Sequence, residues 1–126
     1  MYVLDDRYRD IAEDIINSVP ELAFLSDIRI AFLSCDTAKV SHGHLVHGEC
    51  KKIPDMFGAL LPYSFIITAY EPNCEGFDDM KYRILIEHEL RHIGTKNGEP
   101  CVVPHDIELG EFRAIGEKYG YEWDVK

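Results

Sequence analysis

The string His-Glu-x-x-His at positions 88–92 carries more potential chemistry than any other stretch of the chain. Residues four apart on an α-helix share one face, so His88 and His92 can offer ring nitrogens to a single metal ion about 2 Å away. Glu89 lies one position further round the helix, where its carboxylate can reach a metal-bound water instead of the metal. The spacing predicts one zinc ion per chain, with Glu89 as the catalytic base of a hydrolase.

The surroundings of the motif favour a metal site over two incidental histidines on a solvated helix face. The motif is short enough to arise by chance, so it needs supporting context. The turn before it, residues 84–86, is apolar, as expected for a helix that lies on a core. Gly94 follows directly and is expected to stop the helix in the left-handed conformation.

A third ligand is required, because a catalytic zinc takes three protein ligands and keeps one position for water. His105 is the preferred candidate, since it is the only histidine after the motif and the twelve intervening residues let the chain turn back beside the helix. Glu108 and Glu111 are the rival third ligands, as carboxylates on a following helix. Asp106 is expected to cap that helix or to orient a ligating imidazole.

A second group of possible ligands comprises His42, His44 and His47, flanked by Cys35 and Cys50. In a strand the first two histidines share one face, while the third lies on the other unless a glycine introduces a bulge. A polar hairpin with exposed histidines is the preferred interpretation, and a structural zinc is the alternative.

Two charged residues and three tyrosines could lie near the metal ion. Glu87 and Arg91 place charges before and between the two histidines, and the helical phase favours solvent positions for both over a role of Arg91 in the cleft. A donor for the developing oxyanion is often a tyrosine in such sites. Tyr63, Tyr119 and Tyr121 are the candidates, but a core or rim position is the preferred interpretation of each.

The first half of the chain predicts one helix and a set of strands. Apolar residues recur at helical spacing over about 5–19, where Pro20 ends the pattern. The segment 27–33 predicts a strand, the glycine-interrupted segment 38–53 a second strand or hairpin, and the segment 54–61 a short helix or turn.

The second half places the metal motif between a strand and a final helix. The segment 63–70 is the strongest strand signal in the chain, either at a sheet edge above the cleft or as a fully paired central strand. The metal helix is expected over about 77–94, a turn and an extended segment over 95–104, and a last helix over 106–119 capped by Gly120.

Length, composition and charge bound the class of protein. The 126 residues fit one domain, 1–126, and 46% hydrophobic with 29% charged residues is globular. The net charge of −10 argues against broad nucleic-acid binding by phosphate neutralisation. The apolar runs are too short for a membrane span, and the start lacks a secretory signal, so we expect a cytoplasmic protein with no membrane partner.

The cysteine pattern agrees with a reducing compartment. Cys35, Cys50, Cys74 and Cys101 are widely spaced, and no two of them form a Cys-x-x-Cys pair. We therefore expect four free thiols and no disulfide framework.

The second half of the chain resembles the phage-type metallopeptidase family of the zincin class. The likeness runs through five stretches: 62–67, 88–94, 103–108, Phe112 and 119–120. It implies an α+β fold, a compact zincin-like domain in which a small mixed β-sheet packs with an N-terminal helix, the metal helix and a C-terminal helix. It also implies a histidine-aspartate pair supplying the last ligand. SprT-like proteases are a more distant likeness.

Together the motif and the resemblance predict a zinc-dependent metallopeptidase whose partner is a peptide or protein substrate. His88, His92 and His105 hold the zinc, and Glu89 takes the proton of the attacking water and passes it to the leaving amine. An exposed edge of strand 63–70 would bind the peptide as an added strand. The alternatives are a non-catalytic, zinc-stabilised binding protein and a zinc hydrolase of a non-peptide substrate.

Overall fold

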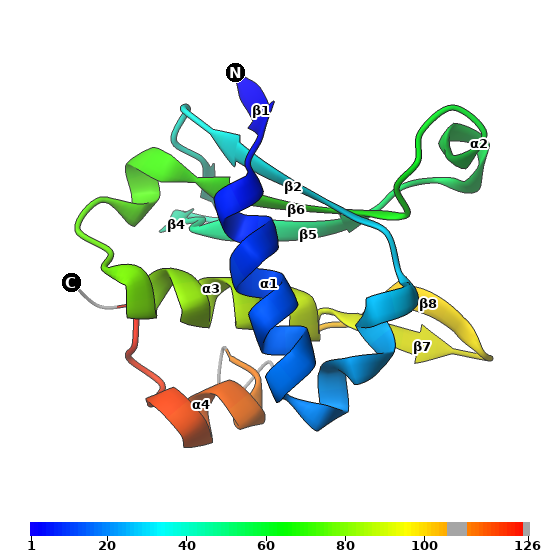
Figure 1. Ribbon diagram of the computed structural model, residues 1–126. Coiled ribbons are helices and arrows are strands. Elements are labelled where there is room, and N and C mark those ends of the chain that lie inside the picture. Colours follow the sequence, from blue (N-terminus) through cyan, green and yellow to red (C-terminus); the bar gives the residue numbers. More distant parts are fainter. Residues whose placement is uncertain (106–110, 125–126) are drawn as a thin grey trace.

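A four-stranded mixed β-sheet is the centre of the fold in the computed structural model, which describes residues 1–105 and 111–124 (Figure 1). The strand order is β1-β2-β6-β5. Their bounds are β1 Tyr2–Leu4, β2 Ile30–Cys35, β5 Gly48–Lys52 and β6 Phe65–Tyr70. The central pair, β2 and β6, is parallel, and both outer strands run antiparallel to their neighbours. The α+β class and the small mixed sheet expected from the sequence are confirmed.

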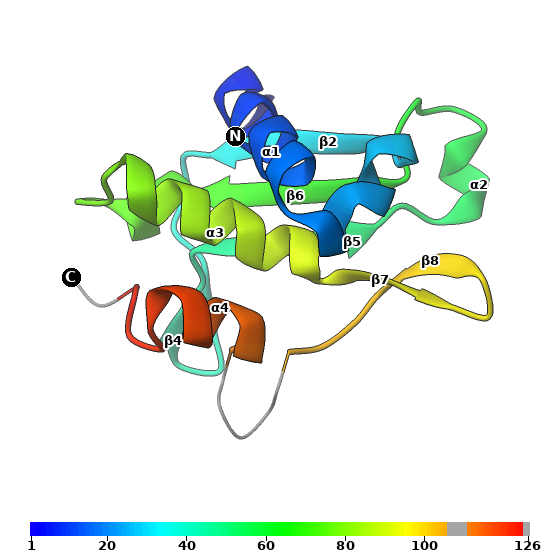
Figure 2. The same ribbon diagram turned by 60° about the horizontal axis from the view of Figure 1, so that its bottom comes forward.

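Most of the helical residues lie on one side of this sheet, in four segments (Figure 2). They are α1 (Asp6–Ser18), the 3₁₀ helix η1 (Pro20–Asp27), α3 (Asp79–Arg91) and α4 (Arg113–Tyr119). Side chains alternate between the two faces of a strand, so Phe32, Phe65 and Ile67 point from β2 and β6 toward the helices. There they pack in one core with Ile15 of α1 and Leu85 of α3. This packing fixes how α3 lies on the sheet.

The N-terminal helix agrees with its predicted bounds, while the following strand begins later than predicted. Asp5 caps α1 by accepting a hydrogen bond from the Arg7 backbone N–H at 3.1 Å. Pro20 ends the helix and opens η1, which extends to Asp27. The predicted strand 27–33 therefore starts only at Ile30, because its first residues complete the 3₁₀ helix and its cap.

The strand predicted over 63–70 is β6, and it lies in the middle of the sheet. It pairs with β2 along one edge and with β5 along the other. The expectation that this strand binds substrate at a sheet edge is therefore wrong. The backbone groups of β6 are paired with β2 and β5, so neither edge of β6 is free for a peptide. The edge strand next to β6 is β5.

Short elements connect these strands. The predicted hairpin comprises β3 (Val40–Ser41) and β4 (His44–Leu45) ahead of β5, and α2 (Asp55–Gly58) follows β5. The 3₁₀ helix η2 (Glu71–Cys74) joins β6 to the loop before α3.

The chain after α3 forms a second hairpin from β7 (Ile93–Lys96) and β8 (Glu99–Val102). Its turn residues Asn97 and Gly98 both have positive φ, 55° and 80°, as a two-residue type I′ turn requires. This hairpin sends the chain back toward the end of α3.

Gly94 does not stop the metal helix in the left-handed conformation, contrary to the sequence prediction. The helix ends at Arg91 with His92 as its cap, and Gly94 belongs to β7. A glycine is needed here for steric reasons, because a Cβ at this position would lie 2.8 Å from Cγ1 of Val103 on the returning chain. The glycine thus allows the close approach of the segment that leads to His105.

The last helix is shorter than predicted. It begins at Arg113, and the Phe112 cap before it is extended. The predicted start at Asp106 lies outside the described residues. Gly120 ends the helix with φ +89°, as predicted. Among the helices that the structure describes, none is long and apolar enough to cross a membrane.

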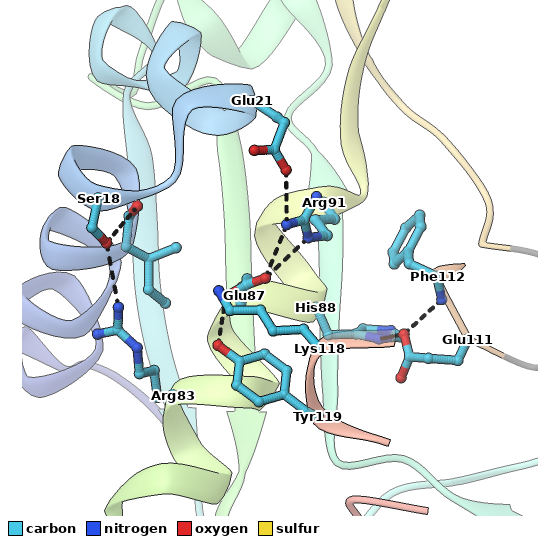
Figure 3. A network of polar contacts seen from close by, with 11 residues as sticks. Ser18, Glu21, Arg83, Glu87, His88, Arg91, Glu111, Phe112, Lys118 and Tyr119 are labelled. Carbon is cyan, nitrogen blue, oxygen red and sulfur yellow. Dashed lines mark hydrogen bonds and ion pairs between the residues drawn. The ribbon is translucent and has the colours of Figure 1, made fainter. Parts of the chain in front are cut away.

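A buried carboxylate fastens α4 to α3 (Figure 3). The Glu87 side chain is 0% exposed, so its predicted solvent position is wrong. Lys118 Nζ donates to it at 3.0 Å and the Tyr119 hydroxyl at 2.8 Å, both from α4, while Arg91 Nε donates at 3.1 Å from one turn along α3. Arg91 also reaches Glu21, which draws it away from the metal-binding face. Several donors are needed because an unpaired buried charge is very costly.

We expect Glu87→Gln to lower the free energy of unfolding by about 3 kcal/mol, because it leaves three donors facing a neutral amide. Glu117 is an exposed residue of the same α4 and provides the control. Glu117→Gln is expected to change stability by less than about 0.5 kcal/mol. Urea denaturation of both variants measures the difference, and equal stabilities would contradict a structural role for Glu87.

The effect of Glu87→Gln should also depend on pH. Burial alone would raise the pKa of Glu87, but hydrogen bonds from Lys118, Tyr119 and Arg91 outweigh it and hold the pKa below its ordinary value of 4.5. Such a carboxylate stabilises the fold above its unfolded-state pKa and loses this contribution as the pH falls through its folded-state pKa. The difference between wild type and variant should be constant above about pH 5 and shrink below it. A difference that grows on acidification would contradict this assignment.

Candidate metal centre

Helix α3 presents His88 and His92 side by side. Its first turn is capped by Asp78, whose side chain accepts from the Lys81 backbone N–H at 2.9 Å. His92 keeps helical backbone angles at the C-terminal cap, so the four-residue spacing still places both rings on one face. The two Nε2 atoms are 3.2 Å apart.

His105 completes the group from the chain that returns after β8. The Val103 backbone N–H donates to the His92 carbonyl at 2.7 Å and holds this segment against the end of α3. The His105 ring centre lies 5.5 Å from those of His88 and His92. One possible ligand atom from each histidine lies within 4.8 Å of the other two, and across residues 1–105 and 111–124 no other such group of three occurs. The structure therefore brings the three predicted ligands together.

Hydrogen bonds orient the two helix histidines. Glu111 Oε1 lies 2.5 Å from His88 Nδ1, and the Val103 carbonyl oxygen lies 2.7 Å from His92 Nδ1. Both partners are acceptors, so each Nδ1 must carry the proton and each Nε2 keeps its lone pair. Two nitrogens bound to one tetrahedral zinc at 2.0–2.1 Å would lie about 3.3 Å apart, close to the spacing found. The donor set therefore fits a zinc ion.

Glu111 binds the outer nitrogen of His88 instead of joining the histidine group (Figure 3). Its two carboxylate oxygens are also held by the Phe112 backbone N–H at 2.7 Å and by Trp123 Nε1 at 2.8 Å. Burial would raise the pKa of Glu111, but these three contacts lower it, so the carboxylate is charged. The same contact raises the pKa of His88 against the effect of burial. Glu108, the other rival ligand, lies outside the described residues.

Glu89 lies beside the histidines and points toward the edge strand β5. Its side chain is 4% exposed, and its Oε2 is 3.9 Å from His88 Nε2. Burial raises the pKa of Glu89 to about 7. A Cβ at Gly48 of β5 would lie 3.0 Å from the Thr68 carbonyl oxygen and 3.3 Å from Glu89 Oε2, so the glycine gives the carboxylate its space.

A cleft of about 330 Å³ opens over these groups. Its walls come from the β3–β4 segment, β5, α3 and β8, and Cys50 of β5 faces Glu89 from the opposite side. Burial and the neighbouring Glu89 carboxylate raise the pKa of the Cys50 thiol to about 12, so it remains protonated. The Phe112 ring contacts all three imidazoles, with centre-to-centre distances of 4.8–5.8 Å. The site is thus open toward β5 and closed by an aromatic side chain on the side of α4.

The tyrosines considered as oxyanion donors lie elsewhere. The Tyr119 hydroxyl binds Glu87, and the Tyr121 ring packs over Gly116 of α4. Tyr63 lines two other hollows, one bounded by α1, η1 and β2 and one that reaches β8. None of the three lines the cleft, which agrees with the preferred expectation that they lie in the core or at the rim and not with a role as oxyanion donors.

The histidine hairpin does not gather into a second metal group in the described part of the chain. His42 and His44 are exposed, whereas Cys35 is buried in β2. His47 Nδ1 lies 2.9 Å from the Asn73 carbonyl oxygen. The exposed His42 and His44 agree with the preferred interpretation as a polar hairpin, and no disulfide joins Cys35, Cys50, Cys74 or Cys101, as predicted.

The structure is an α+β domain with a group of three histidines that could hold a metal ion. The profile of the family described as "Putative phage metallopeptidase" matches residues 1–126, so the chain belongs to this family. The resemblance found in the second half thus extends over the whole chain. No curated protein and no solved structure matches it. The family description supports a metal-dependent peptidase as the general class of activity.

Sequence reasoning missed the roles of three residues around His88. Glu111 was considered only as a ligand, and Phe112 and Trp123 were given no role in the site. The one signal for Glu111 was its carboxylate, which made it a rival third ligand after His105. Its partner is 23 residues away in sequence, a contact that local periodicity cannot predict.

We expect Glu111→Gln to weaken Zn²⁺ binding by about 10–100-fold, because the amide no longer fixes the His88 ring through a charged acceptor. Glu122→Gln, an exposed change in the same C-terminal segment, should leave the affinity unchanged. Competition with a chromophoric chelator measures both. Equal affinity of the two variants would show that Glu111 does not support the ligand.

Proposed function

We propose that the protein is a zinc-dependent peptidase. The observation that carries this proposal is the pair of Nε2 atoms 3.2 Å apart, with the buried Glu89 carboxylate beside them in an open cleft. A zinc that served only the fold would not require an acidic residue at this point. The buried carboxylate therefore favours catalysis over a purely structural metal.

His88, His92 and His105 would hold the ion through their ring nitrogens. Bound there, zinc would polarise a peptide carbonyl and lower the pKa of a water molecule toward neutrality. Glu111 and the Val103 carbonyl would keep the helix histidines in the required tautomer.

Glu89 is proposed as the general base and acid. A carboxylate with a pKa near 7 can accept a proton from the attacking water and return it to the leaving amine at neutral pH. Its position next to His88 and opposite Cys50 leaves it facing the cleft. The protonated Cys50 thiol does not compete as a base, because its own pKa is far higher.

The substrate is proposed to bind as an extended peptide along β5. This strand pairs with β6 on one side only, and Gly48, Glu49 and Cys50 line the cleft. A peptide added to this edge would gain backbone hydrogen bonds and pass in front of Glu89. The edge strand β5 thus replaces β6 in the role expected from the sequence.

We expect Glu89→Gln to reduce hydrolysis of a fluorogenic peptide library by about 10²–10⁴-fold while zinc binding persists, because it removes only the proton acceptor. Glu75→Gln, an exposed change before α3, is the control and should remain active. Activity is measured on zinc-loaded protein, with metal content determined on the same samples. Full activity of Glu89→Gln would overturn the proposed mechanism.

A further inference from the structure

The short helix α2 carries an apolar surface that nothing in the described chain covers. Leu60 and Leu61 both donate backbone hydrogen bonds to the Phe57 carbonyl at 2.9 Å, so the helical turn continues to Leu61. Met56, Phe57, Leu60 and Leu61 are 74%, 44%, 77% and 46% exposed. We call residues 55–61 the exposed turn. It projects from the body of the molecule beyond the ends of β5 and β6 (Figures 1 and 2).

The spacing of these side chains makes one continuous patch. Met56 and Leu60 are four residues apart, as are Phe57 and Leu61, so each pair shares a face, and the two pairs lie next to each other around the turn. Contiguous exposed apolar side chains on a soluble protein often mark an interaction site. The exposed turn is therefore suited to insertion into an apolar groove.

Such a groove lies next to the turn on the same molecule. A hollow of about 540 Å³ is bounded by α1, η1 and β2. It is larger than the metal cleft of about 330 Å³. Ile16, Ile28 and Phe32 contribute apolar walls. Pro62 and Tyr63, which directly follow the exposed turn, form its nearest rim.

One charge of the groove is complementary to the exposed turn. Arg9, Glu13 and Arg29 line the groove, and Arg9 lies 3.6 Å from Asp6, so Arg29 is the positive charge that a partner can meet. Arg29 is exposed, and no ion pair of Arg29 is found among residues 1–105 and 111–124. Asp55 begins the exposed turn and would approach Arg29 when the turn enters a groove.

We propose that the exposed turn of one copy of this chain occupies the groove of a second copy, and the reverse, in a two-fold symmetric dimer. A two-fold interface needs a patch that is complementary to itself, so projection and groove must lie close together on one molecule. Their connection through Pro62 and Tyr63 meets this requirement. Each dimer would contain the apolar insertion and the Asp55–Arg29 contact twice, which doubles the buried area.

The interface leaves the metal centre free. The groove and the metal cleft share no lining residue. Peptide binding along β5 and zinc binding by the histidines therefore do not depend on the dimer, so the two proposals succeed or fail separately.

Sedimentation equilibrium of the purified chain from micromolar to millimolar concentration tests the proposal. The wild type is expected to dimerise, and Leu60→Asp should raise the dimer dissociation constant by more than about tenfold. Met80→Asp, which changes an exposed apolar residue of α3 outside the patch, is the control and should still dimerise. A monomeric wild type at all concentrations, or equal dimerisation of both variants, would overturn the proposal.

A charge exchange identifies the two sides of the contact. Arg29→Asp should weaken the dimer, and Asp55→Arg in the same chain should restore it, because the attraction is re-formed with opposite signs. Circular dichroism of each variant confirms that the fold is retained. Failure of the double variant to regain affinity would contradict this pairing. Binding of a monomeric chain to anionic vesicles would instead assign the turn to a membrane surface and overturn the dimer.

Discussion

Two neighbouring residues of α3 hold the C-terminal segment in place, and the geometry of the metal centre depends on this double attachment. Glu87 turns to the α4 side and binds Lys118 and Tyr119, while His88 turns to the cleft and meets Glu111. A buried carboxylate cannot remain charged without such partners. The requirement to satisfy Glu87 therefore keeps α4 in place, and α4 in turn keeps Glu111 and Phe112 against the histidines.

The side chains of α3 point in three directions, and each direction has a different role. Glu87 faces α4, His88 and His92 face the cleft, and Glu89 faces the edge strand β5. Each step of about 100° along the helix thus changes the partner of the side chain. The surroundings then set the chemistry, because Glu87 is kept charged by several donors whereas the buried Glu89, with few donors near it, has a pKa near 7. Two carboxylates two positions apart are thereby assigned to stability and to the proposed proton transfer.

Local features of the sequence predicted local features of the structure. The helix around His88 and His92, the turn at Gly98 and the strand β6 follow from periodicity and turn residues over a few positions. His105 could be selected because few histidines were available and the chain had room to return. The resemblance to the family supplied the α+β class, which the sheet confirms.

Contacts between distant segments were outside the reach of these patterns. The order of strands places β5 at the edge, although β6 has the stronger strand signal, because pairing depends on the whole sheet. Glu87 is buried because its partners come from residues 31 and 32 positions later. Gly94 leaves room for the Val103 side chain, and this role can be seen only when the position of the returning chain is known.

The metal content of the purified chain, measured by plasma mass spectrometry without added zinc, tests the central claim most directly. We expect one zinc per chain in the wild type and in His44→Ala, which alters an exposed histidine of the hairpin. His105→Ala should lose the metal, because two imidazoles on one helix leave the tetrahedral ion short of a protein ligand. A wild type that binds no zinc even after loading, or a His105→Ala variant that retains it fully, would contradict the three-histidine centre.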